Sequence, residues 1–522
     1  MKNITLAILC ILALGLEAQK SGKSVEFEFS DELLVNGFAI IPDNQTERAS
    51  VFIGGAVSSG FLKYDLFIYK INKRSLKVEA EVQYKPEVFK GRSAPFSRRM
   101  WGDKQIEFYS GYNKETDIQS LIMLDFDANN LKQGKFKSMY ELKSKKRGEN
   151  IIKSKWAVND SLVLAYSVLE TEKDENKQLA VRLMDHHFET KFEATLDLER
   201  KSKKFTVNDI ELLNNGSIIM LCSQKRKSSE KGSSKESDYE YYLYKLNIES
   251  QEFEEYSLGL SKQPISDIFL TVDEAGDQVV LSGLYMDKYR LAGSFFGLFN
   301  DDPKQAAEIT LHPFDKKFNQ DFLRSSDAKA ASTTQKGGLR TNFSPVKVFT
   351  LSNGTYTAVY EEYYVKEVTT RTNNSTMTTY YYNYGPAVYF NYTEKGELNY
   401  SGVAPKMQTT TNDDGVYSGV GVLKNGNQIH LFWNDNPKNL ARLADPTKQP
   451  KGIKKGAKKS VLAMFTINED GMGTYEHVGV NPFKNMAFLP RFGTPVSLNS
   501  NELFIPMTIG KKAMRLARIT VE

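Results

Sequence analysis

Hydrophobic and polar residues alternate along most of the chain, in short segments separated by turn residues. The pattern is clearest over 208–258, where four segments alternate: Asn208–Leu213, Ser217–Cys222, Tyr239–Asn247 and Glu252–Leu258. Alternation with a period of two, rich in Tyr, Phe, Val and Ile and bounded by Asn, Gly and Asp, is typical of β-strands. We therefore predict a unit of four consecutive strands.

The same pattern recurs on both sides of this unit. Further four-stranded units are predicted at 265–311, 345–401 and 416–479. Weaker copies have their second strands at Val51–Gly55, Gln105–Ser110 and Ser161–Ser167, and a last, three-stranded copy has Pro495–Leu498, Glu502–Met507 and Met514–Val521. The alternating segment Ser24–Phe29 precedes the first unit and is expected to supply the strand that the last copy lacks.

Radial repetition of four-stranded sheets is the signature of a β-propeller. We predict an all-β protein with eight four-stranded blades, in which the N-terminal strand completes the last blade. Residues 19–522 then form a single domain. Seven blades is the close alternative, because the early copies are weakly marked, and two stacked β domains is a further one.

The first 18 residues have the features of a secretory signal peptide. A lysine at position 2 precedes an apolar run from Ile4 to Leu16, and the small residue Ala18 follows. The run is shorter than the roughly 20 residues that span a bilayer. We expect export to the periplasm, with the cell surface or the extracellular space as alternatives.

The long connections between the predicted strands fall on one face of the propeller. They join the second strand of a blade to the third, or one blade to the next, and are 84–99, 140–153, 223–238, 312–343, 363–385, 402–414, 434–460 and 480–493. Binding residues concentrate on loops that a rigid scaffold carries. Several of these connections are net basic, although the whole chain carries a formal charge of only +5. A cationic face attracts anionic partners.

The residues chosen as candidate binding residues are aromatic or basic and are assigned to these connections, except Trp433, which ends the predicted strand just before the connection 434–460. They are Tyr363, Tyr364, Tyr380, Tyr381, Tyr382, Trp433, Arg98, Arg99, Lys454, Lys455, Lys458 and Lys459. Tyrosine offers a large, rigid contact area with a polar tip, which suits sugar or protein binding. The alternative for the tyrosine segment is a long hairpin whose rings pack on each other.

The sequence offers few residues for catalysis or metal binding. It has two cysteines and five histidines, none in a zinc-binding spacing, and it contains no nucleophile elbow, phosphate loop or calcium loop. We expect no metal, no cofactor and no nucleic-acid partner. Glu361 and Glu362 follow a predicted inner strand, and paired acids can cleave glycosides. Neighbours on a strand point to opposite sides, however, so one of the two at most faces the channel.

The stretch Val346–Leu440 resembles an uncharacterised family of secreted, β-propeller-like proteins from Bacteroidetes-type bacteria. The motifs that carry the resemblance are Glu361-Glu362-Tyr363-Tyr364, Tyr380-Tyr381-Tyr382-Asn383, Pro405-Lys406-Met407-Gln408, Asn412-Asp413-Asp414-Gly415 and Trp433-Asn434-Asp435-Asn436-Pro437. The resemblance implies export and a propeller-like architecture, and it brings no known activity or catalytic residues.

From the sequence we therefore expect an exported, non-catalytic binding or scaffold protein of the cell envelope. Its long-loop basic face would bind an envelope protein or an anionic polysaccharide, as a monomer or as a subunit of a larger complex. The alternative is a hydrolase or lyase that acts on polysaccharide with the same face. That alternative requires convergent acids or histidines, which the motifs do not reveal.

Overall fold

The structure is a computed structural model of the chain. It describes residues 25–34, 39–40, 49–60, 63–85, 95–227, 231, 236–287, 290–299, 309–325, 343–372, 375–445, 448–453, 459–480, 483, 486–496, 500–509 and 513–522. The predicted signal peptide and the candidate residues Lys454, Lys455 and Lys458 lie outside this part of the chain.

The strands form eight antiparallel sheets, each built mainly from strands that follow one another in the chain. The first sheet contains β3 (Ala39–Ile40), β4 (Ser50–Gly60), β5 (Lys63–Asn72) and β6 (Val78–Tyr84), and the second contains β7 (Ser97–Trp101), β8 (Lys104–Asn113), β9 (Ile118–Asp127) and β10 (Lys137–Lys143). The third sheet contains β11 (Lys153–Trp156), β12 (Leu162–Leu169), β13 (Asn176–Asp185) and β14 (Thr190–Lys201). The fourth contains β15 (Phe205–Leu212), β16 (Ile218–Lys225), β17 (Tyr239–Asn247) and β18 (Glu252–Ser257). The fifth sheet contains β19 (Ile265–Val272), β20 (Val279–Asp287), β21 (Arg290–Phe299) and β22 (Thr310–Pro313). The sixth contains β23 (Phe343–Thr350), β24 (Tyr356–Thr372), β25 (Ser375–Tyr392) and β26 (Leu398–Ala404), and β27 (Gln408–Thr411) also pairs with β25. The seventh contains β28 (Gly421–Asn425), β29 (Gln428–Asp435), β30 (Val461–Ile467) and β31 (Gly473–Val480).

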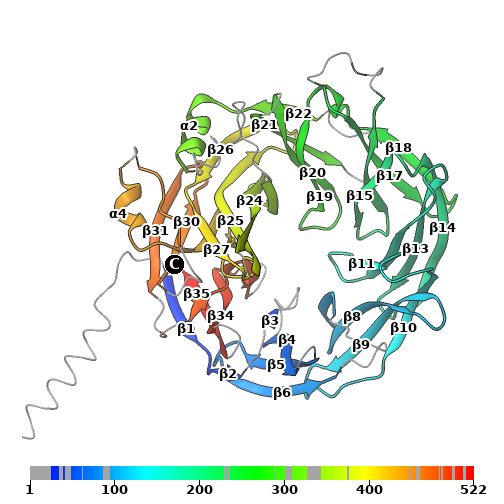
Figure 1. Cartoon of the computed structure of the whole chain (residues 1–522), viewed down its shortest axis with the longest axis horizontal. Coiled ribbons are helices and arrows are strands. Elements are labelled where there is room, and N and C mark those ends of the chain that lie inside the picture. The colour runs from blue at the N-terminus through cyan, green and yellow to red at the C-terminus, as the bar shows by residue number, and fades with distance from the viewer. Residues whose placement is uncertain are drawn as a thin grey trace, which may run out of the picture.

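The eighth sheet combines both ends of the described chain. It contains β32 (Ala487–Phe488), β33 (Thr494–Pro495), β34 (Glu502–Ile509) and β35 (Ala513–Val521), and its outer edge is β1 (Val25–Phe29) with β2 (Leu33–Leu34). The sheets are arranged in a ring around a central axis, as Figure 1 shows. Below, we number them as blades 1 to 8 in the order given. The prediction of an eight-bladed β-propeller is confirmed, and the seven-bladed alternative is wrong.

The ring closes where β1 pairs with β35 in antiparallel register. The paired residues run from Val25 opposite Val521 to Phe29 opposite Ala517. The Arg518 guanidinium forms an ion pair with Glu28 and donates to the backbone oxygen of Lys73 in blade 1 at 2.7 Å. The N-terminal strand therefore supplies the missing outer strand of the last blade, as the sequence predicted.

The hydrophobic core lies between the blades and not at the centre of the ring. In the described residues, each pair of neighbouring blades shares one large apolar cluster, including blades 8 and 1 through Phe67, Phe504 and Leu516. Middle strands such as β30 are buried along their whole length because both of their faces meet a neighbouring blade. Outer strands such as β6 alternate between exposed and partly buried residues, since one of their faces meets water.

The turns on one face of the ring are short. The inner strand β28 is joined to its neighbour β29 by the two residues Gly426 and Asn427, and Gly426 has a φ of +61° that favours glycine. On the opposite face lie the longer connections. The one predicted at 312–343 contains α2 (Lys316–Ser325), whose Phe318 and Phe322 pack into the core between blades 5 and 6. The one at 434–460 contains the short helix α4 (Asn439–Leu443).

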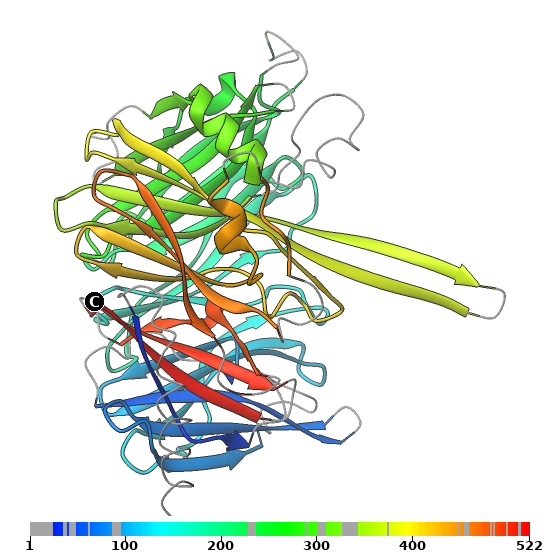
Figure 2. The ribbon, with the colours of Figure 1, turned by 90° about the vertical axis from the view of Figure 1, so that its left-hand side faces the viewer.

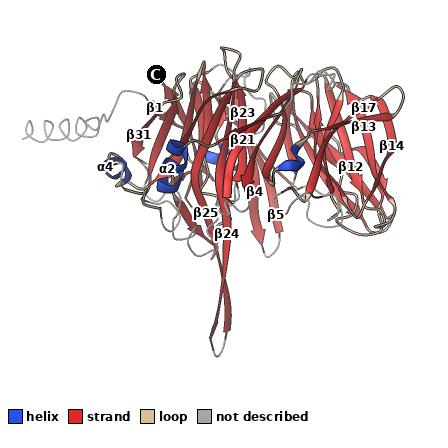
Figure 3. Ribbon diagram, turned by 90° about the horizontal axis from the view of Figure 1, so that it is seen from above, coloured by secondary structure: helices blue, strands red, loops and turns tan. Residues whose placement is uncertain are grey.

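A two-stranded arm projects from blade 6 on the long-connection face. Strands β24 and β25 stay paired from Tyr363 opposite Tyr384 to Thr372 opposite Ser375, and we call residues 363–384 the arm. Figures 2 and 3 show it standing well clear of the ring. The sequence predicted a long connection at 363–385 here, with a long hairpin as the alternative. The hairpin is what the structure contains, because Thr, Val and Tyr continue the strand pattern through the segment.

None of the helices in the described residues is long and apolar enough to cross a membrane.

Removing the Phe27 side chain tests the ring closure. Its ring packs against Phe488, at 6.2 Å between centroids, and lies 2.6 Å from where a Cβ on Gly479 would be. We expect Phe27→Ala to lower the free energy of unfolding by about 2 kcal/mol, measured by urea denaturation. Glu26→Ala, on the exposed face of the same strand, is the control and should change it by less than about 0.5 kcal/mol. Equal effects of the two substitutions would contradict this account of the closure.

Candidate functional site

Blades 6, 7 and 8 meet around a cavity of about 340 Å³ at the root of the arm. Its charged and aromatic lining comes from blade 6 and from two loops: Glu361, Tyr363 and Tyr384 lie on β24 and β25, Asp414 precedes β28, and Arg491 lies between β32 and β33. Segments that are far apart in sequence thus bring two carboxylates, a guanidinium and two phenols to one place. We take this cavity as the candidate active site.

A β-bulge lies at the root of the arm, next to Glu361. The register between β24 and β25 shifts between Glu361 and Tyr363, where Gly385 and Pro386 on β25 face the single residue Glu362, so the extra residue is on β25. Alternation along β24 is unbroken, so Glu361 and Tyr363 share one face and Glu362 points to the other. Glu361 lines the cavity, whereas the carboxylate of Glu362 lies against the backbone of Gly385, where a Cβ would collide with it. The expectation that one of the two acids at most faces the channel agrees with this arrangement.

Glu361 is held by a lysine that has no solvent exposure. The Nζ of Lys406 lies 2.6 Å from Oε1 of Glu361, and the two side chains are 0% and 7% exposed. Burial lowers the pKa of Lys406, and the nearby Glu361 carboxylate opposes that shift. Taking both charges out of water is costly, so each depends on the other to stay in place.

Tyr384 lies between two cations on the opposite wall. Nη1 of Arg491 donates to its hydroxyl at 2.6 Å, and Lys406 Nζ lies 5.7 Å from its ring centroid. Burial raises the pKa of Tyr384 to about 12, so its hydroxyl stays protonated at neutral pH. Arg491 itself is exposed, and a guanidinium has five N–H donors, which leaves donors for an anionic group in the cavity.

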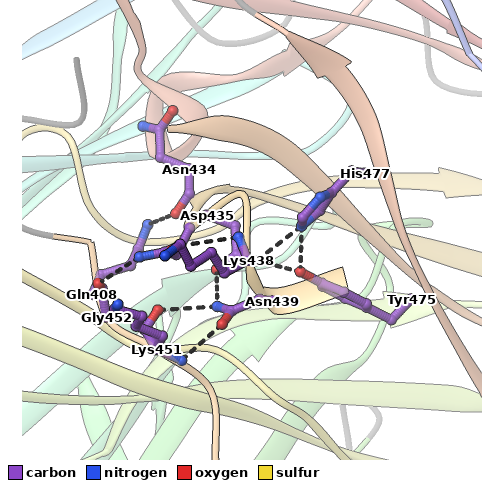
Figure 4. A network of polar contacts seen from close by, with 10 residues as sticks. Gln408, Asn434, Asp435, Lys438, Asn439, Lys451, Gly452, Tyr475 and His477 are labelled. Atoms are coloured by element: carbon purple, nitrogen blue, oxygen red, sulfur yellow. Dashed lines mark hydrogen bonds and ion pairs between the residues drawn. The ribbon is translucent and has the colours of Figure 1, made fainter. Parts of the chain in front are cut away.

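A buried polar network supports the cavity from behind. Lys406 donates to Oε1 of Gln408 at 3.2 Å, and Nε2 of Gln408 donates to the backbone oxygen of Asn434 at 2.9 Å. Asn434 in turn donates to the backbone oxygen of Phe488 at 2.8 Å. These bonds connect blades 6, 7 and 8, and Figure 4 shows the part of the network around Gln408 and Asn434.

The same network continues outward from the cavity through Asp435. This fully buried carboxylate accepts a hydrogen bond from Nδ2 of Asn439 at 2.8 Å and one from the Tyr475 hydroxyl, and Nε2 of His477 lies 3.2 Å from it (Figure 4). Burial and the Asp435 charge raise the pKa of Tyr475. Asn439 is the first residue of α4, and its side-chain amide also forms two hydrogen bonds with the backbone of Lys451. These contacts anchor the 434–460 connection on blade 7.

The five candidate tyrosines all lie on the arm, and the structure brings one of them into the cavity. Tyr363 lines the cavity with its ring 4.7 Å from that of Tyr384. Tyr380 is 41% exposed, and Tyr364, Tyr381 and Tyr382 are half-buried. Lys459, the one member of its lysine group that the structure describes, is exposed before β30 and belongs to no described part of the cavity.

Three candidate residues do not lie where the sequence analysis placed them. Trp433 is fully buried in the core between blades 6 and 7, stacked on Tyr475, because β29 is a middle strand with both faces covered. Arg98 and Arg99 belong to β7 and not to a loop. Arg98 Nε bonds Oε1 of the buried Glu107 at 2.7 Å, and Arg99 is paired with Asp160. Their charges are already neutralised, so they do not form a free cationic surface.

The sequence analysis missed several residues of the site. Lys406 and Asp414 lie in the connection 402–414 and Arg491 lies in 480–493, both expected on the long-loop face, but none of the three was chosen as a candidate. In the structure Asp414 and Arg491 line the cavity, and the buried Lys406 pairs with Glu361. Their position in two of the long connections was the signal that the sequence offered.

A second charged cluster lies on the innermost strands of blades 3 and 4. Nζ of Lys155 on β11 is 2.6 Å from Oε1 of Glu211 and 3.5 Å from Oδ1 of Asp209, both on β15. Burial raises the pKa of Glu211 to about 7, although Lys155 opposes the shift. Among the residues that the structure describes, no group of three or more His, Cys, Asp or Glu side chains is arranged to hold a metal ion.

The known proteins that are similar in structure share little sequence with this chain. No protein-family model matches the chain, and no curated protein matches it. Among solved structures, a polysaccharide lyase is similar at 9% identity with a TM-score of 0.36, covering 81% of this chain and 89% of that one. The β-propeller domain of the Trilobed protease from Pyrococcus furiosus has 11% identity and a TM-score of 0.33, covering 74% and 100%. An α-L-arabinanase from Penicillium chrysogenum has 11% identity and a TM-score of 0.33, covering 65% and 94%.

The expectation of a non-catalytic binding or scaffold protein is contradicted at this point. The similar structures include a polysaccharide lyase and an arabinanase. The convergent acids that the sequence motifs did not reveal are present in the cavity, as Glu361 and Asp414. Similarity at this level assigns no activity to this chain, so the case for catalysis depends on the side chains of the cavity.

Substituting Lys406 tests whether the buried ion pair holds the site. We expect Lys406→Met to lower the free energy of unfolding by about 3–5 kcal/mol, because it leaves Glu361 buried without a counter-ion. The double variant Lys406→Met/Glu361→Leu should recover most of this loss. Lys317→Met, which breaks the exposed pair of Lys317 with Asp321 on α2, is the control and should cost less than about 1 kcal/mol. Chemical denaturation of the four proteins measures these differences, and a double variant no more stable than Lys406→Met would contradict the coupling.

Glu211 should make stability depend on pH. Its pKa is about 7 in the folded chain against an ordinary value of 4.5, so the folded state binds more protons than the unfolded state between these values. Its contribution is therefore complete below about pH 4.5 and is lost as the pH rises through 7, on the order of 3 kcal/mol in total. In denaturation curves from pH 4 to 8, Glu211→Gln should remove this loss, whereas Glu252→Gln on the exposed edge of β18 should keep the wild-type profile. An unchanged profile in Glu211→Gln would contradict the assignment.

Proposed function

We propose that this chain is an exported enzyme that cleaves an anionic polysaccharide by hydrolysis at the cavity between blades 6, 7 and 8. The observation that carries the proposal is the convergence of Glu361 and Asp414 on one cavity that also holds Arg491. Glycoside hydrolysis uses two carboxylates, one that transfers a proton to the leaving oxygen and one that activates water or attacks the sugar. Glu361 and Asp414 fill these two positions.

The other groups of the cavity bind and orient the substrate. Arg491 offers guanidinium donors that match a carboxylate on a uronic acid. The protonated Tyr384 hydroxyl, fixed by its bond from Arg491, offers a further polar contact. Tyr363 supplies an aromatic wall on which a sugar ring can pack. The ion pair with Lys406 fixes the Glu361 side chain and prevents it from moving away from the cavity.

Eliminative cleavage is a second candidate, and the Arg491–Tyr384 pair favours it. In this reaction a base removes the proton next to the uronate carboxylate, whose developing charge a guanidinium stabilises, and an acid such as a phenol protonates the leaving oxygen. Hydrolysis adds one water for each bond cleaved, whereas elimination adds none and leaves a double bond. Mass spectrometry of the products therefore distinguishes the two reactions.

Incubation of the purified protein with uronate-containing and neutral polysaccharides tests the function. We expect shortened chains and new reducing ends from the uronate-containing ones. Asp414→Asn should lower kcat by about 10²–10⁴ while keeping the acceptor for the Tyr382 hydroxyl, which lies 2.8 Å away. Asp413→Asn, in the same loop but outside the cavity lining, is the matched control and should leave kcat within about twofold.

Substituting Glu361 needs a control for folding, because it also removes the counter-ion of Lys406. Glu361→Gln and Glu361→Gln/Lys406→Met should lose activity alike, and the double variant should regain stability without regaining kcat. Shortening of no polysaccharide by the wild type, or full activity in Asp414→Asn and in the double variant, would overturn the proposal.

We also propose that the protein acts in the periplasm, on a polysaccharide of the cell envelope, as a monomer or as part of a larger envelope complex. The basic start, the apolar run and Ala18 at the N-terminus support export. Fractionation of cells that express the chain, with detection of the processed N-terminus, tests this proposal. Retention of an unprocessed chain in the cytoplasm would contradict it.

A further inference from the structure

The arm presents a row of tyrosines that begins inside the cavity. Residues directly opposite each other in an antiparallel pair project from the same face of the sheet, and successive residues alternate between faces. Tyr363 opposite Tyr384, Val365 opposite Tyr382 and Glu367 opposite Tyr380 therefore share one face. Tyr384, Tyr382 and Tyr380 follow one another along it, about 6.5–7 Å apart.

This row leads outward from the buried end of the cavity to an exposed surface. Tyr384 is 5% exposed and lines the cavity, Tyr382 is half-buried, and Tyr380 is 41% exposed. The Tyr382 hydroxyl donates to Oδ1 of Asp414, a carboxylate that also lines the cavity. The cavity and the tyrosine row are thus one continuous surface.

The root of the arm is braced so that the row keeps its position. Strand β27 pairs with β25 from Gln408 opposite Tyr384 to Thr411 opposite Tyr381, which makes the root three-stranded. The backbones of Asn412 and Tyr380 are joined, and the Asn412 side chain accepts a second bond from the Tyr380 amide at 2.9 Å. A two-stranded hairpin alone is marginally stable in water, so this bracing is what fixes the tyrosine row beside the cavity.

We infer that the tyrosine row is a binding surface for the polysaccharide chain next to the bond that is cleaved, so that the enzyme acts on extended chains and grips several sugars along the arm. A pyranose ring has a C–H face that packs on an aromatic ring and a rim of hydroxyls that bond to the phenolic oxygen. Tyrosines at regular spacing on a rigid strand offer both contacts repeatedly, with little loss of side-chain entropy. The inference rests on the proposed function, since the row extends the same site.

Tyr380→Ala tests the inference, because the described hydrogen bonds at Tyr380 are those of its backbone. The variant and the wild type are compared on a uronate polysaccharide and on a short oligosaccharide of the same sugars that fills only the cavity. We expect KM for the polymer to rise about tenfold, which is what the loss of one good aromatic contact amounts to, with kcat unchanged. KM for the short oligosaccharide should stay as in the wild type.

Tyr381→Ala is the matched control. It removes the same side chain from the neighbouring position, on the opposite face of the arm, and should leave both KM values unchanged. Circular dichroism and the unfolding midpoint of each variant show whether the arm is still folded.

Each outcome separates the inference from the function. Unchanged KM for the polymer in Tyr380→Ala, or equal effects of Tyr380→Ala and Tyr381→Ala, would overturn the inference while cleavage by the wild type still supports the function. Equal increases of KM for polymer and short oligosaccharide would also overturn it, because they would show a disturbed cavity and not a lost contact. Failure of the wild type to cleave any uronate chain would overturn both.

Discussion

The pairing of β1 with β35 is the constraint on which the whole structure depends. Each blade buries its two faces only against its neighbours, so an open ring would leave the apolar faces of blades 1 and 8 in water. Strand β1 completes the sheet of blade 8, and that blade packs on blade 1 through Phe504, Met514 and Leu516. A closed ring leaves few free strand edges, and that closure makes a long chain of weakly similar units one domain.

Closure also makes the cavity possible. Glu361, Asp414 and Arg491 come from blade 6, from the connection into blade 7 and from blade 8, and they converge because the ring holds these blades in fixed order. The cost of burying Lys406 and Glu361 is offset by their mutual attraction and by the hydrogen bond from Lys406 to Gln408, whose own amide is held by the backbone oxygen of Asn434. A site that joins three blades in this way is rigid, as catalysis by positioned groups requires.

Individual residues show why the site was harder to predict than the fold. Glu361 and Tyr363 were visible in the sequence, because they end a strand and begin an aromatic segment. Arg491 has no local pattern around it, and its importance comes from its bond to Tyr384, which lies 107 residues earlier in the chain. Trp433 was expected on the surface, since aromatic residues near loops are common in binding sites, but β29 is covered on both faces. Arg98 and Arg99 have acidic partners, Glu107 and Asp160, that net charge does not reveal.

By itself, the sequence determined the repeat of four-stranded units, their strand order and the closure by the N-terminal strand, and it left seven or eight blades open. These features follow from local alternation and turn chemistry, which each segment carries regardless of its neighbours. Only the tertiary structure decided that the tyrosine segment is a projecting arm, that α2 fills a blade junction, and that Glu361 and Arg491 line one cavity while the buried Lys406 pairs with Glu361. The reason is physical. A buried charge is tolerated only beside its partner, and partners from different blades become neighbours only when the ring has closed.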